Sequence, residues 1–361
     1  MNIFPEILQS KPKFIDLFCG LGAFRIGFEN SGFKCVFSSD INQKIQDVYE
    51  ANFGDRPHGD ITTIDPVEIP DFDILLGGFP CQPFSISGKK QGFKDTRGTL
   101  FFSICKIIEQ KQPQVVILEN VKHLINHDKK RTMSVILSSL KELGYNVNYE
   151  LLNAKDFGLP QNRERIFIIA TKNGVFDFSK LKKTPSLPLI NFLDNSTKHE
   201  ILDKSEYTLL DEGIYKQQEH SGLIFIGYRN KNKFSKGIRP NTEHLNRVHR
   251  QPNRIYSVLG YHPTIPSQES SGRFFIYFPQ EDFVRKLTID ECFRIMGYPI
   301  DYKRIGLASE QYKQIGNSVA INVVKAVAAE VVNQNLITNE SKTKASRNIH
   351  RIINNQFTLA V

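Results

Sequence analysis

Short apolar runs alternate with amphipathic stretches through the first half of the chain. The runs are bounded by turn residues, as buried strands are, and they begin at residues 13, 34, 73, 115, 146 and 166. The stretches between them repeat apolar residues at the helical period, over 23–31, 43–52, 99–110 and 124–144. Strands that alternate with helices predict a mostly parallel sheet covered by helices, which is the α/β class.

The alternation stops at about residue 180, where Pro185 and Pro188 mark a linker. Three aromatic-rich runs follow, at 223–228, 254–259 and 273–278. Runs of this kind predict short strands, so we expect a second, smaller β-rich unit.

The last part of the chain returns to helical patterns. Thr288 with Glu291 three residues later predicts a capped helix, and 314–319 predicts a glycine-polar turn. A final helix at 320–335 is apolar enough to pack back on the first unit. The expected parts are a first domain at 1–184 completed by 316–337, a second domain at 185–284, a hinge segment at 285–315 and a polar basic tail at 338–361.

One thiol lies on a stiff loop just past the carboxyl end of a predicted strand. The strand that begins at Asp73 ends at two glycines, and Pro80 and Pro83 bracket Cys81 and remove two backbone donors. Ligands and chemistry collect at this edge of open α/β sheets, which makes Cys81 a candidate nucleophile. A Pro-rich turn around a small buried residue is the alternative, because free cysteines are usually buried and inert.

Carboxylates end two other predicted strands near the start of the chain. Asp40 follows the glycines of the pattern Gly20-x-Gly22-x4-Gly27 by about 20 residues, an arrangement that holds a nucleoside ribose. The pattern departs from G-x-G-x-x-G, so a nucleoside without phosphates fits better than a dinucleotide. Glycines that serve helix packing explain it equally well. Asp60 is suited to accept a hydrogen bond from an exocyclic amine, or to cap a turn.

Charged residues also end the later strands of the first domain. Glu119 stands at the carboxyl end of the run that begins at 115, and it would lie beside Cys81 if the two strands are neighbours. Arg163 and Arg165 are two positions apart on a strand, so they are expected to share one face as a cationic pair. A solvated edge strand is the alternative.

Charge and cysteine content narrow the class of protein. The 361 residues carry a net charge of +9, and the stretch 227–254 holds eight Lys or Arg against one acid, Glu243. Such a local excess suits a polyanion such as nucleic acid, or forms a solvated basic loop. The five cysteines show no paired spacing, which favours a reducing cytosol over disulfides or a zinc site. No apolar run reaches the ~18 residues of a membrane span, and the first residues lack a signal-peptide pattern.

Six motifs occur in one order along the chain. They are Phe14-Ile-Asp-Leu-Phe-Cys-Gly-Leu-Gly-Ala-Phe, Gly78-Phe-Pro-Cys-Gln-Pro-Phe-Ser, Glu119-Asn-Val, Gln161-x-Arg-x-Arg, Arg285-Lys-Leu-Thr through Met296-Gly-Tyr-Pro, and Gly316-Asn-Ser-Val. Together they closely resemble the bacterial DNA (cytosine-5)-methyltransferases of type II restriction–modification systems. The resemblance covers about 13–332 and is weakest over 185–277, where that family keeps its variable target-recognition region.

The resemblance implies a Rossmann-like, S-adenosylmethionine-dependent catalytic domain, a target-recognition domain and a specific reaction. Cys81 would add to carbon 6 of a flipped cytosine, so that carbon 5 takes a methyl group. Glu119 would protonate or hydrogen-bond the ring nitrogen. Arg163 and Arg165 would favour the thiolate, and Arg165 would also hold the cytosine carbonyl oxygen.

The same resemblance implies the residues that hold the donor, S-adenosylmethionine. They are Phe18, Gly20, Leu21 and Gly22 around the pocket, Asp40 at the ribose, Ile41 next to it in sequence, Asp60 and Ile61 at the adenine, and Pro80, Asn317 and Ser318 on the methionine side. The family often has a glutamate in place of Asp40 and a glycine in place of Ala23, and both changes are mild. No metal is implied.

Double-stranded DNA is the partner that the resemblance implies, with a restriction endonuclease as a functional pair and no stable protein partner. The loop 85–98 would close over the flipped base. The DNA contacts implied or suggested by charge are Ser85, Ser87, Arg97, Arg229, Lys231, Lys233, Arg250 and Arg254. A monomer in the bacterial cytoplasm is expected. The alternatives are a tRNA methyltransferase of the same fold, a non-catalytic DNA-binding module and, from the glycines alone, a nicotinamide dehydrogenase.

Overall fold

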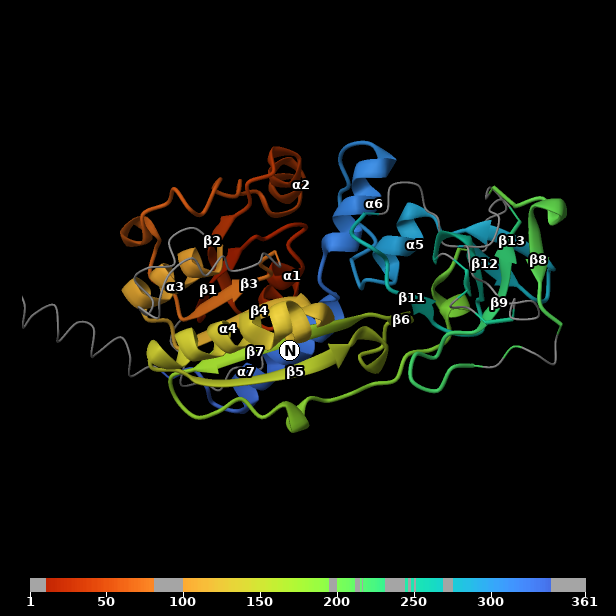
Figure 1. Cartoon of the computed structure of the whole chain (residues 1–361). Helices are drawn as coiled ribbons and strands as arrows, with labels where there is room; N and C mark the ends of the chain where they lie inside the picture. The colour runs from red at the N-terminus through yellow and green to blue at the C-terminus, as the bar shows by residue number, and fades with distance from the viewer. Residues whose placement is uncertain are drawn as a thin grey trace, which may run out of the picture.

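The computed structural model shows an α/β lobe and a smaller β-rich lobe (Figure 1). It describes residues 11–80, 100–194, 200–211, 215, 217–230, 244–245, 248–249, 251–268 and 275–338. The predicted basic tail beyond Thr338 lies outside these ranges. Thr338 itself donates its backbone N–H to Gln114 Oε1 at 2.7 Å.

A six-stranded sheet forms the centre of the α/β lobe, in the order β2-β1-β3-β4-β7-β5. Its strands are β1 (Lys13–Leu17), β2 (Lys34–Ser39), β3 (Ile74–Gly77), β4 (Val115–Val121), β5 (Asn146–Asn153) and β7 (Glu164–Thr171). The first four strands of this order pair in parallel, which confirms the predicted sheet. β7 is antiparallel to both of its neighbours. Two parallel neighbouring strands need a long crossover connection, usually a helix. The connection from β5 to β7 contains no long helix, so β7 runs antiparallel to β5.

Helices cover both faces of this sheet. They are α1 (Ala23–Glu29), α2 (Gln43–Phe53), α3 (Leu100–Lys111), α4 (Arg131–Glu142) and α7 (Ile321–Asn333). One core holds side chains of α1, α2 and α7, and a second holds those of α3 and α4. The strands are apolar on both faces because both faces are buried.

The predicted helix over 124–144 is shorter than expected. α4 begins at Arg131 and is preceded by a 3₁₀ segment, η2 (Lys122–Lys130). Asp128, Lys129 and Lys130 have φ of 47°, 54° and 70°, a left-handed conformation that ends one helical segment before the next begins.

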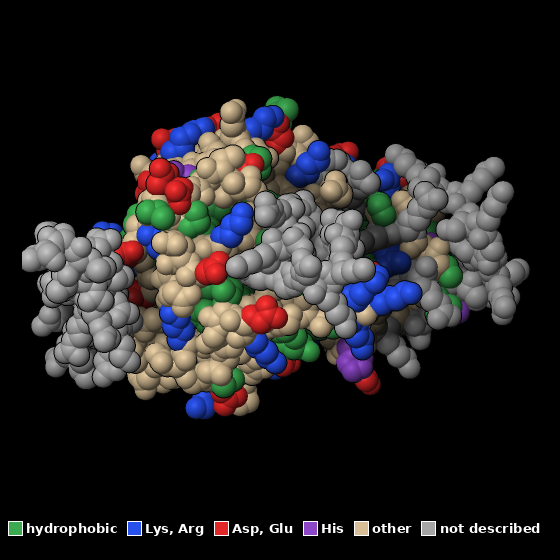
Figure 2. Space-filling model, turned by 60° about the vertical axis from the view of Figure 1, so that its left-hand side comes forward, with side chains coloured by type: hydrophobic (Ala, Val, Ile, Leu, Met, Phe, Trp, Pro, Cys, Tyr) green, Lys and Arg blue, Asp and Glu red, His purple; other side chains and the backbone are tan. Residues whose placement is uncertain are grey.

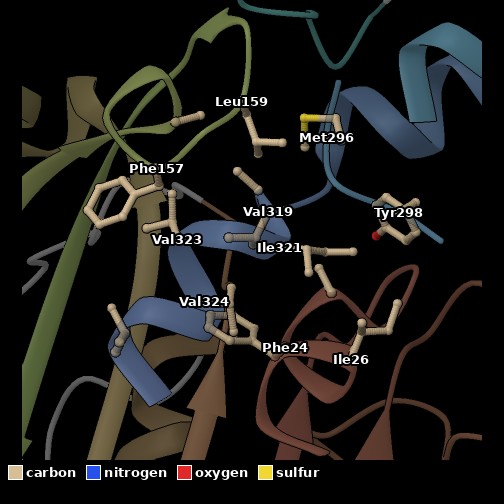
Figure 3. Packing of buried hydrophobic residues seen from close by; sticks show 14 of the residues in the cluster. Phe24, Ile26, Phe157, Leu159, Met296, Tyr298, Val319, Ile321, Val323 and Val324 are labelled. Carbon is tan, nitrogen blue, oxygen red and sulfur yellow. The ribbon is translucent and has the colours of Figure 1, made fainter. Parts of the chain in front are cut away.

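The final helix packs back on the first residues of the chain, as predicted. A Cβ on Gly27 of α1 would lie 2.4 Å from Val324 Cγ1 of α7, so only glycine permits this approach. Phe24, Ile321 and Val324 meet in the same core (Figure 3). The α/β lobe is therefore completed by a segment from the far end of the sequence.

The β-rich lobe contains a five-stranded sheet in the order β13-β12-β10-β9-β8. Its strands are β8 (Tyr207–Leu209), β9 (Phe225–Arg229), β10 (Arg254–Ser257), β12 (Phe275–Phe278) and β13 (Phe283–Lys286). The three strands expected from the aromatic runs are β9, β10 and β12. A further strand, β11 (His262–Pro263), lies outside this sheet. It pairs in parallel with β6 (Gln161–Asn162) of the α/β lobe.

A short helix, α5 (Ile289–Arg294), follows the β-rich sheet. It begins with the predicted capping box, and the buried carboxylate of Glu291 also forms two hydrogen bonds, of 2.7 and 2.8 Å, with Arg285. In the described part of the chain, 3₁₀ turns also occur at η1 (Pro66–Glu68), η3 (Ala154–Asp156), η4 (Phe178–Lys180), η5 (Leu189–Phe192), η6 (Lys204–Glu206) and η8 (Gln251–Asn253).

The glycine-polar turn predicted at 314–319 is wrong in its first half. Residues 314–317 belong to a helix, α6 (Ala308–Asn317), and the chain turns only between this helix and α7. A Cβ on Gly316 would lie 2.2 Å from the carbonyl oxygen of Pro266. Gly316 therefore permits a close approach of two segments inside a helix and does not start a turn.

The stretch Ala308–Asn333 that contains α6 and α7 is apolar enough, among the described residues, to match a membrane span by length and composition. In the fold, 67% of the most apolar 18 residues of this stretch are buried. Burial of this kind is typical of a core helix.

Candidate active site

A cavity of about 1470 Å³ opens at the carboxyl ends of β1, β3 and β4. Single small-molecule pockets are typically ~300–1,000 Å³, so this one has room for two small ligands side by side. Its walls come from the ends of these strands, the start of α2, the segment 264–268 and the junction of α6 with α7.

The turn after β1 has an unusual backbone. Phe18, Gly20 and Gly22 have positive φ of 55°, 51° and 73°. A phenylalanine in this conformation is strained, and such strain is found most often at functional sites. Phe18, Gly20 and Leu21 line the cavity, whereas Gly22 does not. A Cβ on Gly22 would lie 2.4 Å from the Phe53 ring, so this glycine serves helix packing.

Asp40 connects this turn to the end of β2. Its carboxylate accepts hydrogen bonds from the backbone N–H of Gly20 at 3.1 Å and of Asn42 at 2.9 Å. Burial raises the pKa of Asp40, and the two backbone N–H groups act in the opposite direction. The carboxylate lines the cavity with acceptor capacity remaining, which suits a diol.

Three other residues predicted to hold the donor do not line the cavity. The side chain of Ile41 is 71% exposed just after Asp40, and that of Ile61 is buried in the core shared by α3 and α4. Asp60 accepts the backbone N–H of Thr62 at 2.9 Å, which is the turn cap considered as its alternative role. Their contacts with a donor remain predictions.

The end of β3 lies beside Glu119, as the sequence suggested, because β3 and β4 are parallel neighbours. A Cβ on Gly78 would lie 3.5 Å from Glu119 Oε2. The buried Asn120 donates its Nδ2 to the carbonyl oxygen of Phe79 at 2.7 Å and so fixes the backbone next to Pro80. Cys81 follows directly, but it lies outside the described residues, as do Ser85, Ser87 and Arg97.

Glu119 is a buried acid paired with one arginine. Arg165 Nε lies 3.3 Å from Glu119 Oε1, and both side chains line the cavity. Burial raises the pKa of Glu119, whereas the positive charges of Arg165 and Arg163 lower it. Burial lowers the pKa of Arg165 against the opposing charge of Glu119. The site thus holds a carboxyl whose protonated form is favoured more than usual.

Arg163 and Arg165 both lie near enough to Glu119 for their charges to lower its pKa, but the two guanidinium groups have different hydrogen-bond partners. β7 begins at Glu164, so Arg163 lies in the bend before the strand and strand alternation does not apply to it. Its guanidinium donates to carbonyl oxygens of other segments and does not line the cavity. Its predicted catalytic role remains a prediction.

The described basic residues of the β-rich lobe are tied to protein partners. The guanidinium of Arg229 lies 4.6 Å from the centre of the Phe275 ring and pairs with Glu206 at 3.4 Å. Arg254 Nε donates to the carbonyl oxygen of His249 at 2.9 Å. Lys231, Lys233 and Arg250 lie outside the described residues. All five DNA contacts therefore remain predictions.

Acidic and basic side chains are interspersed over the part of the α/β lobe that Figure 2 shows. The described side chains of that face therefore form no large patch of positive charge.

Several cavity residues were not predicted from the sequence. Thr264, Pro266, Ser267 and Gln268 reach the cavity from the β-rich lobe, and no sequence pattern signals them. Lys44 of α2 and Glu310 of α6 form an ion pair between two walls of the cavity. Glu310 also accepts the backbone N–H of Leu307 at the start of α6, at 3.3 Å.

Residues 12–333 match the family model of the C-5 cytosine-specific DNA methylases. The chain belongs to this family, and it is a DNA cytosine-5-methyltransferase of the α/β class.

Individual relatives agree with this assignment. The chain is 38% identical over 334 residues to the type II methyltransferase M.HhaI of Haemophilus parahaemolyticus, covering 88% of this chain and 94% of the relative. It is 40% identical over 339 residues to the type II methyltransferase M.HpaII of Haemophilus parainfluenzae, covering 90% of each. The predicted family and reaction class are thereby confirmed, and DNA is the substrate class.

Solved structures share the fold. The Entamoeba histolytica methyltransferase EhMeth superposes with a TM-score of 0.63 at 17% identity, over 90% of this chain and 99% of that one. The Dnmt2 methyltransferase of S. pombe superposes with a TM-score of 0.61 at 18% identity, over 91% and 100%. At such identities the likeness concerns the fold alone.

Proposed function

We propose that this enzyme uses Cys81 as a nucleophile and S-adenosylmethionine as a donor to methylate a cytosine within a short, specific sequence of duplex DNA. The observation that carries the proposal is the buried Glu119–Arg165 pair beside the backbone that leads into Cys81. An acid with a raised pKa at this position can give a proton to a ring nitrogen. A cytosine must leave the duplex to reach it, at a cost of roughly a few kcal/mol.

The reaction that these residues support balances without a further reagent. The Cys81 thiolate forms a bond to carbon 6, the ring electrons move toward carbon 5, and the Glu119 carboxyl protonates the ring nitrogen. When bound, S-adenosylmethionine supplies a methyl group on a sulfonium, which carbon 5 takes up. Loss of the carbon 5 proton to a base then releases the Cys81 thiolate, and the ring nitrogen returns its proton to the Glu119 carboxylate, which restores the ring.

Covalent trapping tests this proposal. With 5-fluorocytosine in duplex DNA, carbon 5 carries no proton to lose after methylation, so the bond to Cys81 persists. We expect a donor-dependent protein–DNA adduct that survives denaturing electrophoresis, with Cys81 modified in the peptide map. Duplex DNA with unmodified cytosine is the control and gives no adduct. Absence of an adduct in the presence of donor would exclude Cys81 catalysis.

The described residues fit the donor. A strained, glycine-rich turn approaches the cavity closely, and Asp40 offers acceptor oxygens beside it. Phe18, Leu21 and Phe24 supply apolar surface, and the exposed side chain of Ile41 lies next to Asp40. We assign the ribose hydroxyls to Asp40 and the methionine side to Pro80, Asn317 and Ser318.

Donor affinity should depend on Asp40. Asp40→Ala is expected to weaken binding roughly tenfold to a hundredfold, because hydrogen bonds to an ionised carboxylate are lost. Calorimetric titration with S-adenosylhomocysteine measures this without catalysis. Asp47→Ala, an exposed carboxylate of α2 that pairs with Arg56, is the matched control and should bind normally. Unchanged affinity in Asp40→Ala would contradict the assignment.

The β-rich lobe is proposed to read the target sequence, and basic residues around 229–254 to contact phosphates. Binding should then weaken steeply with salt. Bisulfite sequencing of DNA from cells that express the protein identifies the target. We further propose a cytoplasmic monomer that protects DNA against a restriction endonuclease of matching specificity.

A further inference from the structure

Arg163 lies at a junction of three chain segments. Its side chain is 1% exposed. The guanidinium donates to the carbonyl oxygen of Ile265 at 3.0 Å, of Gly316 at 2.8 Å and of Ser318 at 2.5 Å. These carbonyls belong to the segment that arrives from the β-rich lobe and to the junction of α6 with α7. One buried cation thus joins both segments to the bend before β7.

Gln161, on the neighbouring strand β6, holds one of these segments, at Ile265, and also the residues that follow α5. It is fully buried, its Oε1 accepts the backbone N–H of Ile265 at 3.2 Å, and its Nε2 lies 3.3 Å from Met296 Sδ. Thr264 Oγ1 donates to the carbonyl oxygen of Asn162 at 2.6 Å. The pairing of β11 with β6 therefore continues through side chains, and Gln161 and Arg163 together form what we call the clamp.

The segments joined by the clamp are walls of the cavity. Thr264, Pro266 and Ser267 line it from one side, and Gly316 and Ser318 line it from another. The two walls touch where Gly316 faces the carbonyl oxygen of Pro266, an approach that any side chain at 316 would block. The clamp sits behind this contact and does not line the cavity itself.

We propose that Gln161 and Arg163 are positioning residues that fix the wall supplied by the β-rich lobe against the α6–α7 junction, and thereby set the affinity for the donor. The inference rests on the proposed binding of S-adenosylmethionine in this cavity. The proposal gives Arg163 and Arg165 different roles. Arg165 contacts Glu119, the acid at the reacting base, whereas Arg163 holds the cavity wall next to the donor. A catalytic group changes kcat, whereas a positioning residue of this kind changes donor affinity.

The test compares the two arginines. Arg163→Met leaves three carbonyls without their donor, and it should raise the donor Kd and KM about tenfold to a hundredfold, with a smaller change in kcat at saturating donor. Arg163→Lys keeps a cation that reaches some of the carbonyls, so it should recover part of the affinity. Arg165→Met is the matched variant and should lower kcat with donor Kd unchanged. Donor Kd is measured by calorimetry with S-adenosylhomocysteine.

Gly316→Ala provides an independent variant that leaves both arginines in place. Its methyl group would push Pro266 away, so it should raise donor Kd in the same way, and combining it with Arg163→Met should add little. If circular dichroism shows that Arg163→Met does not fold, donor Kd is compared in Arg163→Lys and Gly316→Ala instead. A fall in kcat with normal donor Kd in the Arg163 variants, or strictly additive effects, would overturn the inference. If wild type fails to bind S-adenosylhomocysteine, the proposed donor is wrong instead.

Discussion

Cys81→Ser is expected to reduce methyl transfer below detection while donor binding stays near the wild-type value. A serine hydroxyl is far less acidic than a thiol and gives almost no anion at neutral pH, so the bond to carbon 6 does not form. Incorporation of labelled methyl groups into duplex DNA measures the first effect, and titration with S-adenosylhomocysteine measures the second.

A second thiol provides the control for this experiment. Cys35 lies on β2, where its Sγ is 3.5 Å from the carbonyl oxygen of Phe37, and it does not line the cavity. Cys35→Ser retains a hydrogen-bond donor there and should remain active. Loss of donor binding together with activity in Cys81→Ser would mean that the loop has a structural role.

Glu119→Gln is expected to lower kcat by about 10²–10⁴, the usual contribution of a general acid. The amide keeps the shape of the carboxyl but has no acidic proton to transfer. In wild type the active form is the protonated one, and burial raises its pKa, so kcat should fall as pH rises through that raised pKa. The variant should lack this fall. Steady-state kcat at saturating substrates over a pH series measures both effects.

Neighbouring charges sharpen the same experiment. Arg165 lowers the pKa of Glu119, so Arg165→Met should move the fall in kcat to higher pH. Glu164→Gln alters an adjacent carboxylate that pairs with Lys122 at 2.9 Å and does not line the cavity, and it should leave the pH profile unchanged. A wild-type profile without a fall on the alkaline side would exclude Glu119 as the acid.

The sequence predicted features that depend on local patterns. The position of Asp40 just after β2 followed from a strand, a glycine turn and a second strand, and its hydrogen bond with Gly20 was found only in the structure. Glu119 was expected beside Cys81 if the two apolar runs were neighbouring strands, and the parallel pairing of β3 with β4 meets that condition. The capping box of α5 needed only four residues of sequence.

Features that depend on distant partners were not predicted correctly. Gly316 looked like a turn residue because the reason for it, the carbonyl oxygen of Pro266, lies about 50 residues earlier and in another lobe. The hydrogen bonds of Arg163 to backbone carbonyl oxygens were not predicted. Every residue has a carbonyl group, so the sequence does not show which of them will accept from an arginine. The packing of Arg229 on Phe275 had no signal in the sequence, and the contact of Arg229 with DNA stays a prediction.

The return of α7 to α1 also constrains how the chain is made. α1 is synthesised long before Val324, the residue that faces Gly27. The apolar face of α1 stays uncovered until α7 has been made, and contacts between such distant residues form late and slowly. Final assembly of the α/β lobe therefore waits for the synthesis of α7. A nascent chain that stalls within the β-rich lobe would expose that face to chaperones.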